Sequence, residues 1–391
     1  MKIALFLARN LAEHNADSLI IHEPLKYLMN YKDLDIYLIA PNNIPEDLKT
    51  GLTYIRYRMS NRPILRSLSA FSAILKLLRE DYDLYHVVGP KAAFILFIAL
   101  KLKRQRSPIL YSGFEIIRAI DMKATITGKR IFKNRILRCF LDFRRSIALK
   151  NSDGLIVRAE GYKNYILENG LYKNKIFVIP YAIDTEFFGK KYEKDTHLSK
   201  KLGLTSESVI MYTGEISPIH GVLDLVKALE ILNSKVKNIV LVIVGDGSFY
   251  RMVKDYVLKR QLRNVIFTGR VSHDEIPMYH SIADVLVIPH LRRIDSELLY
   301  PSKLLECLAS GKPIVASNLK AIANVVGDNA ILVAPEDPQA LADAILALLN
   351  DKELSRKKGE NGKKIIYNYS WEETAQKTYG AYKDLIFSTN S

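Results

Sequence analysis

The stretch from Asp284 to Ser317 constrains the fold more than any other part of the sequence. Its apolar run from Val285 to Ile288 is short for a helix, so it predicts a buried strand. Pro301 begins a helical pattern, because a first helical turn needs no hydrogen-bond donor at that position. Gly311 ends the helix, and Ile314 to Ala316 predict the next strand. This order of strand, loop, helix and strand is typical of a parallel α/β sheet.

The loop before this helix has the features of an anion-binding site. It follows the carboxyl end of a strand, where open α/β sheets bind ligands. We expect the unpaired amides of Ser302, Lys303 and Leu304, together with the helix dipole, to favour an anion. Glu306 lies one turn further along the helix and is placed to accept hydrogen bonds from vicinal hydroxyls. A phosphate site beside a diol site predicts a nucleotide ligand.

Strand-like runs alternate with helical patterns along nearly the whole chain, which predicts parallel sheets with helices on both faces. The length of 391 residues favours two domains. A polar, lysine-rich stretch from Tyr181 to Ser208 predicts the linker between them. The predicted strands are 2–8, 35–40, 53–58, 84–88, 108–112, 154–158 and 175–180, then 209–213, 239–244, 265–268, 285–288, 314–316 and 331–334.

Charge and cysteine content narrow the class of protein. The net charge of +15 indicates an acidic partner: nucleic acid, an anionic membrane surface or phosphorylated small molecules. Cys139 and Cys307 are too few for a disulfide framework or a zinc site, which is typical of the reducing cytoplasm. Residues 3–8 predict a first strand and not a signal peptide. The longest apolar run, 92–100, is about half of a membrane span.

One basic segment, Lys123 to Lys150, differs from the rest of the first half. It holds nine Lys or Arg residues against one acid, Asp142. We predict an amphipathic basic helix, which is either a core helix with a solvated back or a membrane-docking helix. Its apolar residues recur at spacings of 4, 4, 3 and 4: Phe132, Ile136, Phe140, Phe143 and Ile147.

Five motifs follow one another between Val209 and Pro335. They are Tyr212-Thr213-Gly214 with His220-Gly221, Val244-Gly245-Asp246-Gly247, Asn264 to Gly269, Ala283 to Pro289, and Pro301 to Glu306 with Gly311 to Ala316. In their order and spacing these motifs resemble the family 4 retaining glycosyltransferases of the GT-B fold. Weaker matches to the same family lie at Asp83–His86, Ile179–Asp184 and Tyr369–Glu372.

The resemblance implies two facing Rossmann-like domains with a cleft between them. An acceptor-binding domain would span residues 1–190, a nucleotide-sugar-binding domain 191–370, and a C-terminal helix, 371–391, would return to the first domain. It also implies a hexosyltransferase that moves a sugar, with retention, from a nucleotide-sugar to a glycan or lipid-linked acceptor. Neither a metal nor a cofactor is expected, because the nucleotide-sugar is a substrate and Lys303 can stabilise the leaving diphosphate.

The resemblance also implies roles for individual residues. Glu297 and His86 are the candidate catalytic residues. Glu215 and His220 stand where the family usually has an Arg and a Lys against the diphosphate, so we expect His220 to protonate as pH falls from 7.5 to 6 and to strengthen donor binding. The predicted donor-binding residues are Gly214, His220, Gly245, Gly247, Arg270, Arg292, Arg293, Pro301, Ser302, Lys303, Leu304 and Glu306.

Several alternatives remain open. His86 is also typical of a core histidine, Glu297 of a surface carboxylate, and Gly245 and Gly247 of a strand-to-helix turn. A nucleotide-sugar epimerase shares the fold and needs no acceptor. A polyanion-binding protein would use the charge alone, but nucleic-acid modules interleave aromatic and basic residues and this chain does not, so no nucleic-acid partner is expected. We predict a cytoplasmic protein at the inner face of the plasma membrane, active in cell-surface polysaccharide synthesis.

Overall fold

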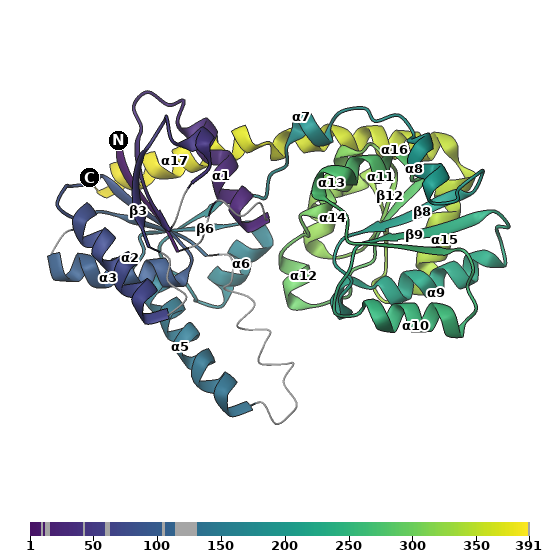
Figure 1. The fold of residues 1–391 in the computed structure, drawn as a ribbon, viewed down its shortest axis with the longest axis horizontal. Coiled ribbons are helices and arrows are strands. Elements are labelled where there is room, and N and C mark those ends of the chain that lie inside the picture. The colour runs from purple at the N-terminus through teal and green to yellow at the C-terminus, as the bar shows by residue number, and fades with distance from the viewer. Residues whose placement is uncertain are drawn as a thin grey trace. The chain divides into compact units, whose positions relative to one another are not determined.

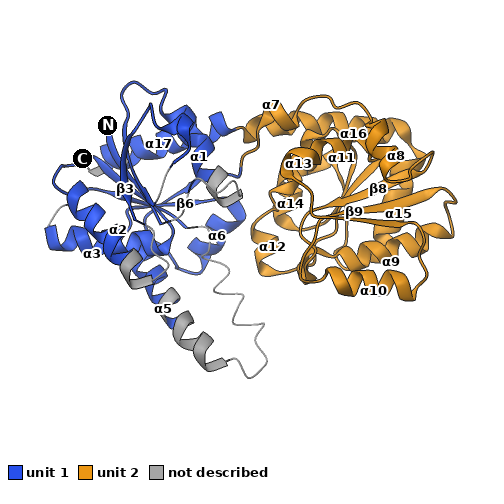
Figure 2. Ribbon diagram, in the orientation of Figure 1, with its two compact units in different colours: residues 1–181, 371–391 blue, residues 182–370 orange. Residues whose placement is uncertain are grey.

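The protein folds into two compact units, which Figure 2 colours separately. The computed structural model describes residues 1–8, 11, 16–41, 44–58, 63–103, 106–113 and 131–389. Unit 1 comprises Met1–Tyr181 and Trp371–Ser391, and unit 2 comprises Ala182–Ser370. The chain therefore completes unit 2 before it returns to unit 1. We predicted a domain boundary at residue 190, and the structure divides the chain earlier, after Tyr181.

Unit 1 contains a seven-stranded sheet in the order β3-β2-β1-β4-β5-β6-β7, and all neighbouring strands are parallel (Figure 1). The order reverses between β1 and β4, which is where a doubly wound sheet opens a crevice at its carboxyl edge. The strands are β1 (Lys2–Leu7), β2 (Asp35–Pro41), β3 (Thr53–Tyr57), β4 (Leu84–Val88), β5 (Ile109–Ser112), β6 (Gly154–Val157) and β7 (Lys175–Val178).

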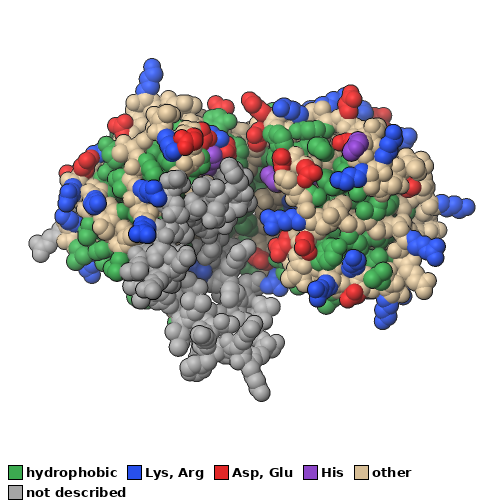
Figure 3. Space-filling model, in the orientation of Figure 1, with side chains coloured by type: hydrophobic (Ala, Val, Ile, Leu, Met, Phe, Trp, Pro, Cys, Tyr) green, Lys and Arg blue, Asp and Glu red, His purple; other side chains and the backbone are tan. Residues whose placement is uncertain are grey.

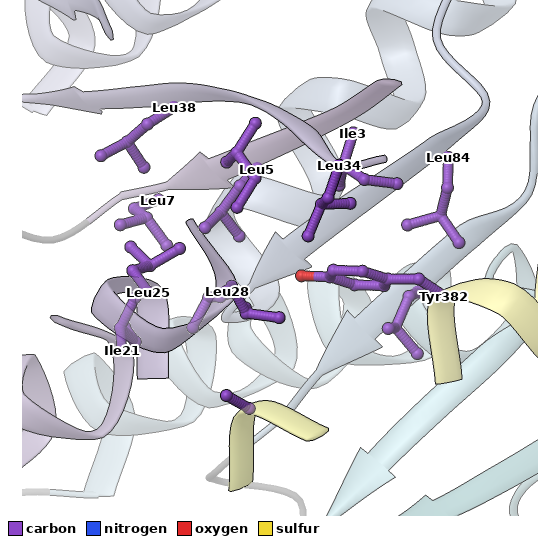
Figure 4. Close-up of a cluster of buried hydrophobic side chains, with 14 of the residues drawn as sticks. Ile3, Leu5, Leu7, Ile21, Leu25, Leu28, Leu34, Leu38, Leu84 and Tyr382 are labelled. Carbon is purple, nitrogen blue, oxygen red and sulfur yellow. The ribbon is translucent and has the colours of Figure 1, made fainter. Parts of the chain in front are cut away.

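The core of unit 1 is closed by the last helix of the chain. Tyr382 of that helix is 1% exposed and points among leucines of β1, β4 and α1 in Figure 4. Tyr379 stacks on Tyr31 with ring centres 4.1 Å apart, and its hydroxyl donates to Asp33 at 2.7 Å. The helices of unit 1 are α1 (Ala16–Leu28), α2 (Pro63–Leu77), α3 (Pro90–Lys103), α5 (Ile131–Lys150), α6 (Glu160–Glu168) and α17 (Trp371–Thr389).

Unit 2 contains a six-stranded parallel sheet in the order β10-β9-β8-β11-β12-β13. Six consecutive aliphatic residues form β9 and all are buried, as expected for a strand that is covered on both faces. The order reverses between β8 and β11, so the crevice of this sheet lies there. The strands are β8 (Ser208–Thr213), β9 (Ile239–Val244), β10 (Val265–Gly269), β11 (Val285–Ile288), β12 (Ile314–Ser317) and β13 (Ile331–Val333).

Aspartate caps set the start of several helices in unit 2. Asp337 and Asp351 accept hydrogen bonds from the amides of Ala340 and Leu354, both at 2.9 Å, and so begin α15 and α16. The helices are α7 (Thr185–Phe188), α8 (Thr196–Lys201), α9 (Val222–Asn233), α10 (Tyr250–Lys259), α11 (Ile276–Ile282), α12 (Ile294–Leu298), α13 (Lys303–Ala309), α14 (Lys320–Val326), α15 (Pro338–Asn350) and α16 (Lys352–Ile365).

The predicted strands are confirmed: β4, β9 and β11 have the predicted bounds, and the other strands differ by at most two residues at either end. The two units divide within the predicted linker, Tyr181–Ser208, directly after its first residue, but the rest of that stretch is folded. It contains α7 and α8, whose first turns are capped by Asp184 and Asp195, and its residues from Ala182 onward belong to unit 2. Helix α12 is a second difference, because it occupies part of the predicted loop before α13.

The basic segment forms α5 over its described part, from Ile131 onward, and residues 123–130 lie outside the described residues. Helix α5 packs against α3, where the rings of Phe143 and Phe94 meet edge to face with centres 6.2 Å apart. Even so, Phe143 remains 54% exposed. Among the described residues, no helix is both long enough and apolar enough to span a membrane.

Candidate functional site

The predicted site residues of unit 2 converge at the carboxyl edge of its sheet. Gly214 follows β8, Gly245 follows β9, Arg270 follows β10, and Pro289 follows β11. Because all these strands are parallel, the loops that leave them share one edge, and α13 begins at the same edge. At this edge, the strand order reverses between β8 and β11, which is where sheets of this kind bind ligands. The position of the candidate site therefore follows from the fold.

The loops after β8 and β9 touch through their backbones. The Ile216 amide, after β8, donates to the Asp246 carbonyl, after β9, at 2.9 Å. A Cβ atom at Gly245 would lie 1.9 Å from the Gly214 carbonyl oxygen, and the Gly245 φ of 140° disfavours any other residue. A Cβ atom at Gly247 would lie 2.3 Å from the Ile216 carbonyl oxygen. Loop packing therefore accounts for Gly245 and Gly247, which supports the structural interpretation of both.

Lys303 begins α13, and its ammonium is held against Tyr212. Nζ donates to the Tyr212 hydroxyl at 2.8 Å and lies 4.2 Å from the ring centre. Gly214 leaves room for this arrangement, because a Cβ atom there would lie 2.9 Å from Nζ. Burial lowers the pKa of Lys303 to about 8. In the described part of the chain the ammonium has this one hydrogen-bond acceptor, so it retains donors for an anionic ligand.

His220 lies beside a second histidine that the sequence analysis missed, His290. The two rings meet edge to face with centres 4.7 Å apart. The backbone fixes this pairing, because Leu291 donates to the Ile219 carbonyl at 3.0 Å and a Cβ atom at Gly221 would lie 1.6 Å from the Pro289 carbonyl oxygen. Gly221 also has a φ of 65°, which favours glycine. The loops after β8 and β11 therefore cross in close contact at this point.

Both imidazoles are neutral near pH 7. Burial, and then the charge of Lys303, lower the pKa of His220 to about 4 and that of His290 well below its ordinary value. The Nδ1 atom of His220 contacts Ser217 Oγ at 3.0 Å, whereas Nδ1 of His290 has no partner among the described residues. The expected protonation of His220 between pH 7.5 and 6 is therefore wrong for the unliganded protein, since burial disfavours the imidazolium.

Glu306 lies on the first turn of α13, and a histidine from another loop holds it. His273 Nε2 contacts Glu306 Oε1 at 3.0 Å, and the His273 ring packs on Phe188 with centres 5.1 Å apart. Glu306 raises the pKa of His273 above its ordinary value through this hydrogen bond, against the opposing effect of burial. Glu306 also lines a small, partly open pocket with Phe188, Tyr192, Pro277, His280, Ser281, Ser310 and Lys312.

Both carboxylate oxygens of Glu297 have partners in unit 2. Its Oε2 accepts from the Lys320 amide, the first of α14, at 2.8 Å, and its Oε1 lies 3.0 Å from Arg292 Nε. Arg293, the N-cap of α12, has its Nε 3.6 Å from Oδ1 of Asp295 in the first turn of that helix. The arrangement gives Glu297 the role of a helix cap, and it places the Arg292 side chain, which is 62% exposed, next to that cap.

The start of α13 differs in detail from the prediction. The Leu304 amide is not unpaired, because it donates to the Pro301 carbonyl at 2.9 Å. The helix spans only seven residues and begins at Lys303, with Ser302 as its N-cap, so the amides that can face a ligand are those of Ser302 and Lys303. Arg270 and Glu215 are both exposed at the same edge. The carboxylate of Glu215 is in solvent and forms no ion pair in the described part of the chain.

His86 is buried in unit 1, whereas the residues described above belong to unit 2. Its Nδ1 contacts the Tyr382 hydroxyl and its Nε2 contacts Ser112 Oγ, each at 2.8 Å. Burial, and then the charge of Arg158, lower the pKa of His86 to about 3. With both ring nitrogens engaged, the structure favours the core role for His86 over the catalytic one.

Three residues of the site escaped the sequence analysis: Tyr212, His273 and His290. Tyr212 was noted only as part of a motif. His290 directly follows Pro289, the first residue after β11. The position of His290 after a strand was a signal that could have found it. His273 gives no such signal, because 33 residues separate it from Glu306 in the sequence.

Two family models match the chain, Glycosyltransferase Family 4 over residues 7–187 and Glycosyl transferases group 1 over residues 194–365. The chain is 27% identical to the uncharacterized glycosyltransferase MJ1178 of Methanocaldococcus jannaschii, over 90% of this chain and 91% of that protein. It is 26% identical to the capsular polysaccharide biosynthesis glycosyltransferase CapM of Staphylococcus aureus, over 88% and 89%.

A solved structure has the same fold along nearly the whole chain. HepE of Anabaena, in a structure described as a complex with UDP, superposes with a TM-score of 0.71 and 18% identity, covering 98% of this chain and 100% of that one. Each half of the chain thus matches a glycosyltransferase model, two parallel sheets match a GT-B structure, and curated glycosyltransferases align over nearly the full length. The chain belongs to the family 4 glycosyltransferases of the GT-B fold.

Proposed function

We propose that this glycosyltransferase moves a hexosyl group, with retention, from a nucleotide-sugar to a glycan or lipid-linked acceptor in the synthesis of cell-surface polysaccharide or glycoconjugate. The observation that carries the proposal is that Lys303 and Glu306 both lie on the first turn of α13. This turn is at the carboxyl edge of the sheet, where the strand order reverses. A cation and a carboxylate one turn apart suit a diphosphate and the diol of the attached ribose. CapM, a relative along most of the chain, is named for capsular polysaccharide biosynthesis.

The proposed chemistry assigns each group a task. Departure of the nucleoside diphosphate leaves negative charge, which Lys303 stabilises from a preformed position beside Tyr212. The neutral His220 and His290 border this position and can donate hydrogen bonds without the cost of burying two further charges. Glu306 binds the ribose hydroxyls. In this proposal the positive charge comes from the protein, so transfer needs no metal ion.

A donor screen tests this proposal. Thermal unfolding of the protein with nucleoside diphosphates and nucleotide-sugars should identify a stabilising ligand, because a ligand at 100 times its dissociation constant adds about 2.7 kcal/mol to the stability of the native state. Lys303→Ala should weaken binding of that ligand by about 1.5 to 3 kcal/mol, the cost of a charge-assisted hydrogen bond. Lys320→Ala is the matched control, since Lys320 is exposed at the start of the next helix, α14.

The outcomes separate the classes of enzyme. Transfer to an added acceptor in the presence of EDTA, with the anomeric configuration of the donor kept in the product, would support a retaining, metal-independent glycosyltransferase. Conversion of the donor sugar without an acceptor would instead indicate an epimerase. Absence of stabilisation by every nucleotide tested would contradict the proposed site.

We also propose that unit 1 docks on anionic lipid and thereby reaches a lipid-linked acceptor at the inner face of the plasma membrane. The basic residues are concentrated in one segment: residues 91–150 contain 15 Lys or Arg and three Asp or Glu, a net charge of +12 out of +15. Unit 2 has 25 Lys or Arg and 23 Asp or Glu, a net charge of +2. On the face drawn in Figure 3, basic and acidic side chains of unit 2 lie intermixed.

The described part of that segment combines exposed apolar and basic side chains. Phe94, Ile98 and Leu102 recur every four residues along α3, and Phe143 of α5 packs at the Phe94 end of this stripe. Ile98 is 40% exposed and Leu102 is 67% exposed. Lys101 and Lys103, at the end of α3, are exposed beside them. Apolar side chains flanked by cations are suited to the surface of an anionic bilayer.

Vesicle co-sedimentation tests the docking proposal. The protein should sediment with vesicles that contain phosphatidylglycerol and not with phosphatidylcholine alone, and salt should weaken the binding. Lys101→Glu with Lys103→Glu should reduce it, since each basic residue near the surface contributes about 1 kcal/mol. The matched control is Lys254→Glu with Lys259→Glu on α10 of unit 2, where both lysines are exposed. Equal sedimentation of both double variants would leave α3 without a docking role.

A further inference from the structure

The carboxylate of Glu306 is held from one side only. His273 Nε2 contacts Oε1 at 3.0 Å, and within the described residues no hydrogen bond involves Oε2. The Glu306 side chain is 17% exposed, so most of its surface is covered while one oxygen remains available. A carboxylate in this state has one oxygen that is fixed and one that can accept hydrogen bonds from a ligand.

The position of His273 is itself fixed. It begins a turn, residues 273–275, that is closed by a capping box in which the Ser272 amide donates to Glu275 Oε2 at 2.9 Å. Its ring then packs on Phe188 of α7 at an interplanar angle of 54°. The capping box therefore fixes the backbone at His273, and Phe188 contacts its ring, while the side chain as a whole is 59% exposed. The turn and the aromatic ring together hold the imidazole beside Glu306.

The charges around His273 keep it a hydrogen-bond donor. Glu306 on α13 and Asp274 on its own turn are the acidic groups that act on it, and Phe188, the residue from α7, is uncharged. Glu306 is the stronger of the two influences and favours the protonated ring. A neutral imidazole that carries its proton on Nε2 donates the same hydrogen bond. The support therefore persists in both protonation states.

We propose that His273 is a positioning residue for the nucleotide: it binds Oε1 of Glu306 so that Oε2 faces the two hydroxyls of a ribose. The inference rests on the proposed function, because it takes Glu306 as the group that binds the ribose. It goes further in predicting that the enzyme discriminates ribonucleotides from deoxynucleotides through a residue that does not touch the ligand. The class of ligand is a ribonucleoside diphosphate, either free or as the donor sugar.

A comparison of ribose with dideoxyribose tests this role. The parent protein is first titrated by calorimetry with UDP, GDP, ADP and CDP, and the tightest ligand is paired with its 2′,3′-dideoxy counterpart. His273→Ala should weaken the ribonucleotide about five- to tenfold, the value of one hydrogen bond, and leave the dideoxynucleotide unchanged. His273→Gln should restore most of the affinity, because its amide can donate to Oε1. In steady-state assays the loss should appear in KM for the donor and not in kcat.

Two controls complete the design. His197→Ala removes an exposed histidine of α8 and should change neither ligand. His273→Ala should have no further effect when Glu306 is already Ala, since the residue acts through that carboxylate. Failure of the parent to bind any of the four diphosphates would overturn the proposed donor site and this inference with it. Equal losses for the ribo- and dideoxynucleotide, or an additive double variant, would overturn the inference alone.

Discussion

Lys303 donates a hydrogen bond to the Tyr212 hydroxyl while its ammonium lies 4.2 Å from the centre of the same ring. Tyr212 is fully buried at the end of β8, and its hydroxyl donates in turn to the Glu215 carbonyl. The lysine is therefore fixed before any ligand arrives. A preformed cation avoids the entropy cost of ordering a flexible lysine when the ligand binds.

The low pKa of Lys303 predicts a pH dependence of ligand binding. Lysine is charged below its pKa, so the unliganded protein loses this charge as pH rises through about 8. We expect affinity for a nucleoside diphosphate to fall between pH 7.5 and 9.5, approaching about 1.4 kcal/mol per pH unit above the pKa. Lys303→Arg should flatten the profile, because arginine stays charged. Calorimetry at constant ionic strength measures this, and identical profiles for parent and variant would refute it.

Two variants of Glu297 distinguish a role as the cap of α14 from a role in catalysis. Because it accepts from the Lys320 amide, Glu297→Ala should destabilise unit 2 by about 1 kcal/mol, as loss of a helix cap does. Glu297→Gln keeps an acceptor and should retain both stability and turnover. Denaturant unfolding and kcat are measured for both variants. A large loss of kcat in Glu297→Gln, with stability intact, would restore Glu297 as a catalytic residue.

Gly245 should tolerate no side chain. Gly245→Ala places a methyl group 1.9 Å from a backbone oxygen at a positive φ, so we expect a loss of more than about 3 kcal/mol in stability. Gly203→Ala is the control, because φ is also positive there, 71°, but no atom lies within 4 Å. That variant should lose only about 1 to 2 kcal/mol, the strain of the left-handed region. Similar unfolding midpoints for the two variants would contradict the described loop contact.

Buried histidines predict instability in mild acid. The pKa of His280 and of His220 is lowered to about 4, and that of His86 to about 3, all by burial. Between pH 6.5 and 4 these histidines are protonated in the unfolded chain but stay neutral in the native protein. The free energy of unfolding therefore decreases as pH is lowered, by up to about 1.4 kcal/mol per pH unit for each histidine. His280→Gln should lessen this slope in urea titrations, whereas the exposed His197→Ala should not. A stability curve that is flat from pH 6.5 to 5 would contradict these assignments.

Tyr382 should be needed for the core of unit 1. Tyr382→Phe leaves the ring in place but removes the hydroxyl at 2.8 Å from His86 Nδ1, which is buried. An unsatisfied buried nitrogen costs about 1 to 3 kcal/mol, so the unfolding midpoint in urea should fall. Tyr379→Phe, whose hydroxyl contacts exposed Asp33, should cost less. If the two variants lose equal stability, the hydrogen bond to His86 contributes little.

The sequence predicted the strands well for a physical reason. Runs such as Ile239–Val244 are apolar throughout, and burial on both faces leaves no other arrangement for them. Short polar helices were the exception. Helices α7 and α8 have four and six residues, too few to show a helical period, and their aspartate caps resemble the polar residues of a loop.

The sequence predicted the site residues that lie on a single helix. It did not predict the contacts that those residues make with other elements. Lys303 and Glu306 lie three residues apart on one helix, so their shared placement follows from local pattern. The partners that set their charge and orientation come from other elements, Tyr212 from β8 and His273 from the turn after β10, and carry no local signal. For the same reason the sequence suggested an ordinary pKa for His220, since burial by a neighbouring loop cannot be seen in a sequence.

The return of the chain to unit 1 has a consequence for its synthesis. Helix α17, which supplies Tyr382 and Leu385 to the core of unit 1, is synthesised only after all of unit 2. Domains usually fold in the order in which they are made. Here unit 1 is interrupted by unit 2, so a nascent chain must carry an open apolar face on unit 1 while unit 2 is being made. A premature stop between unit 2 and α17 would therefore disable unit 1, although most of unit 1 precedes the stop in the sequence.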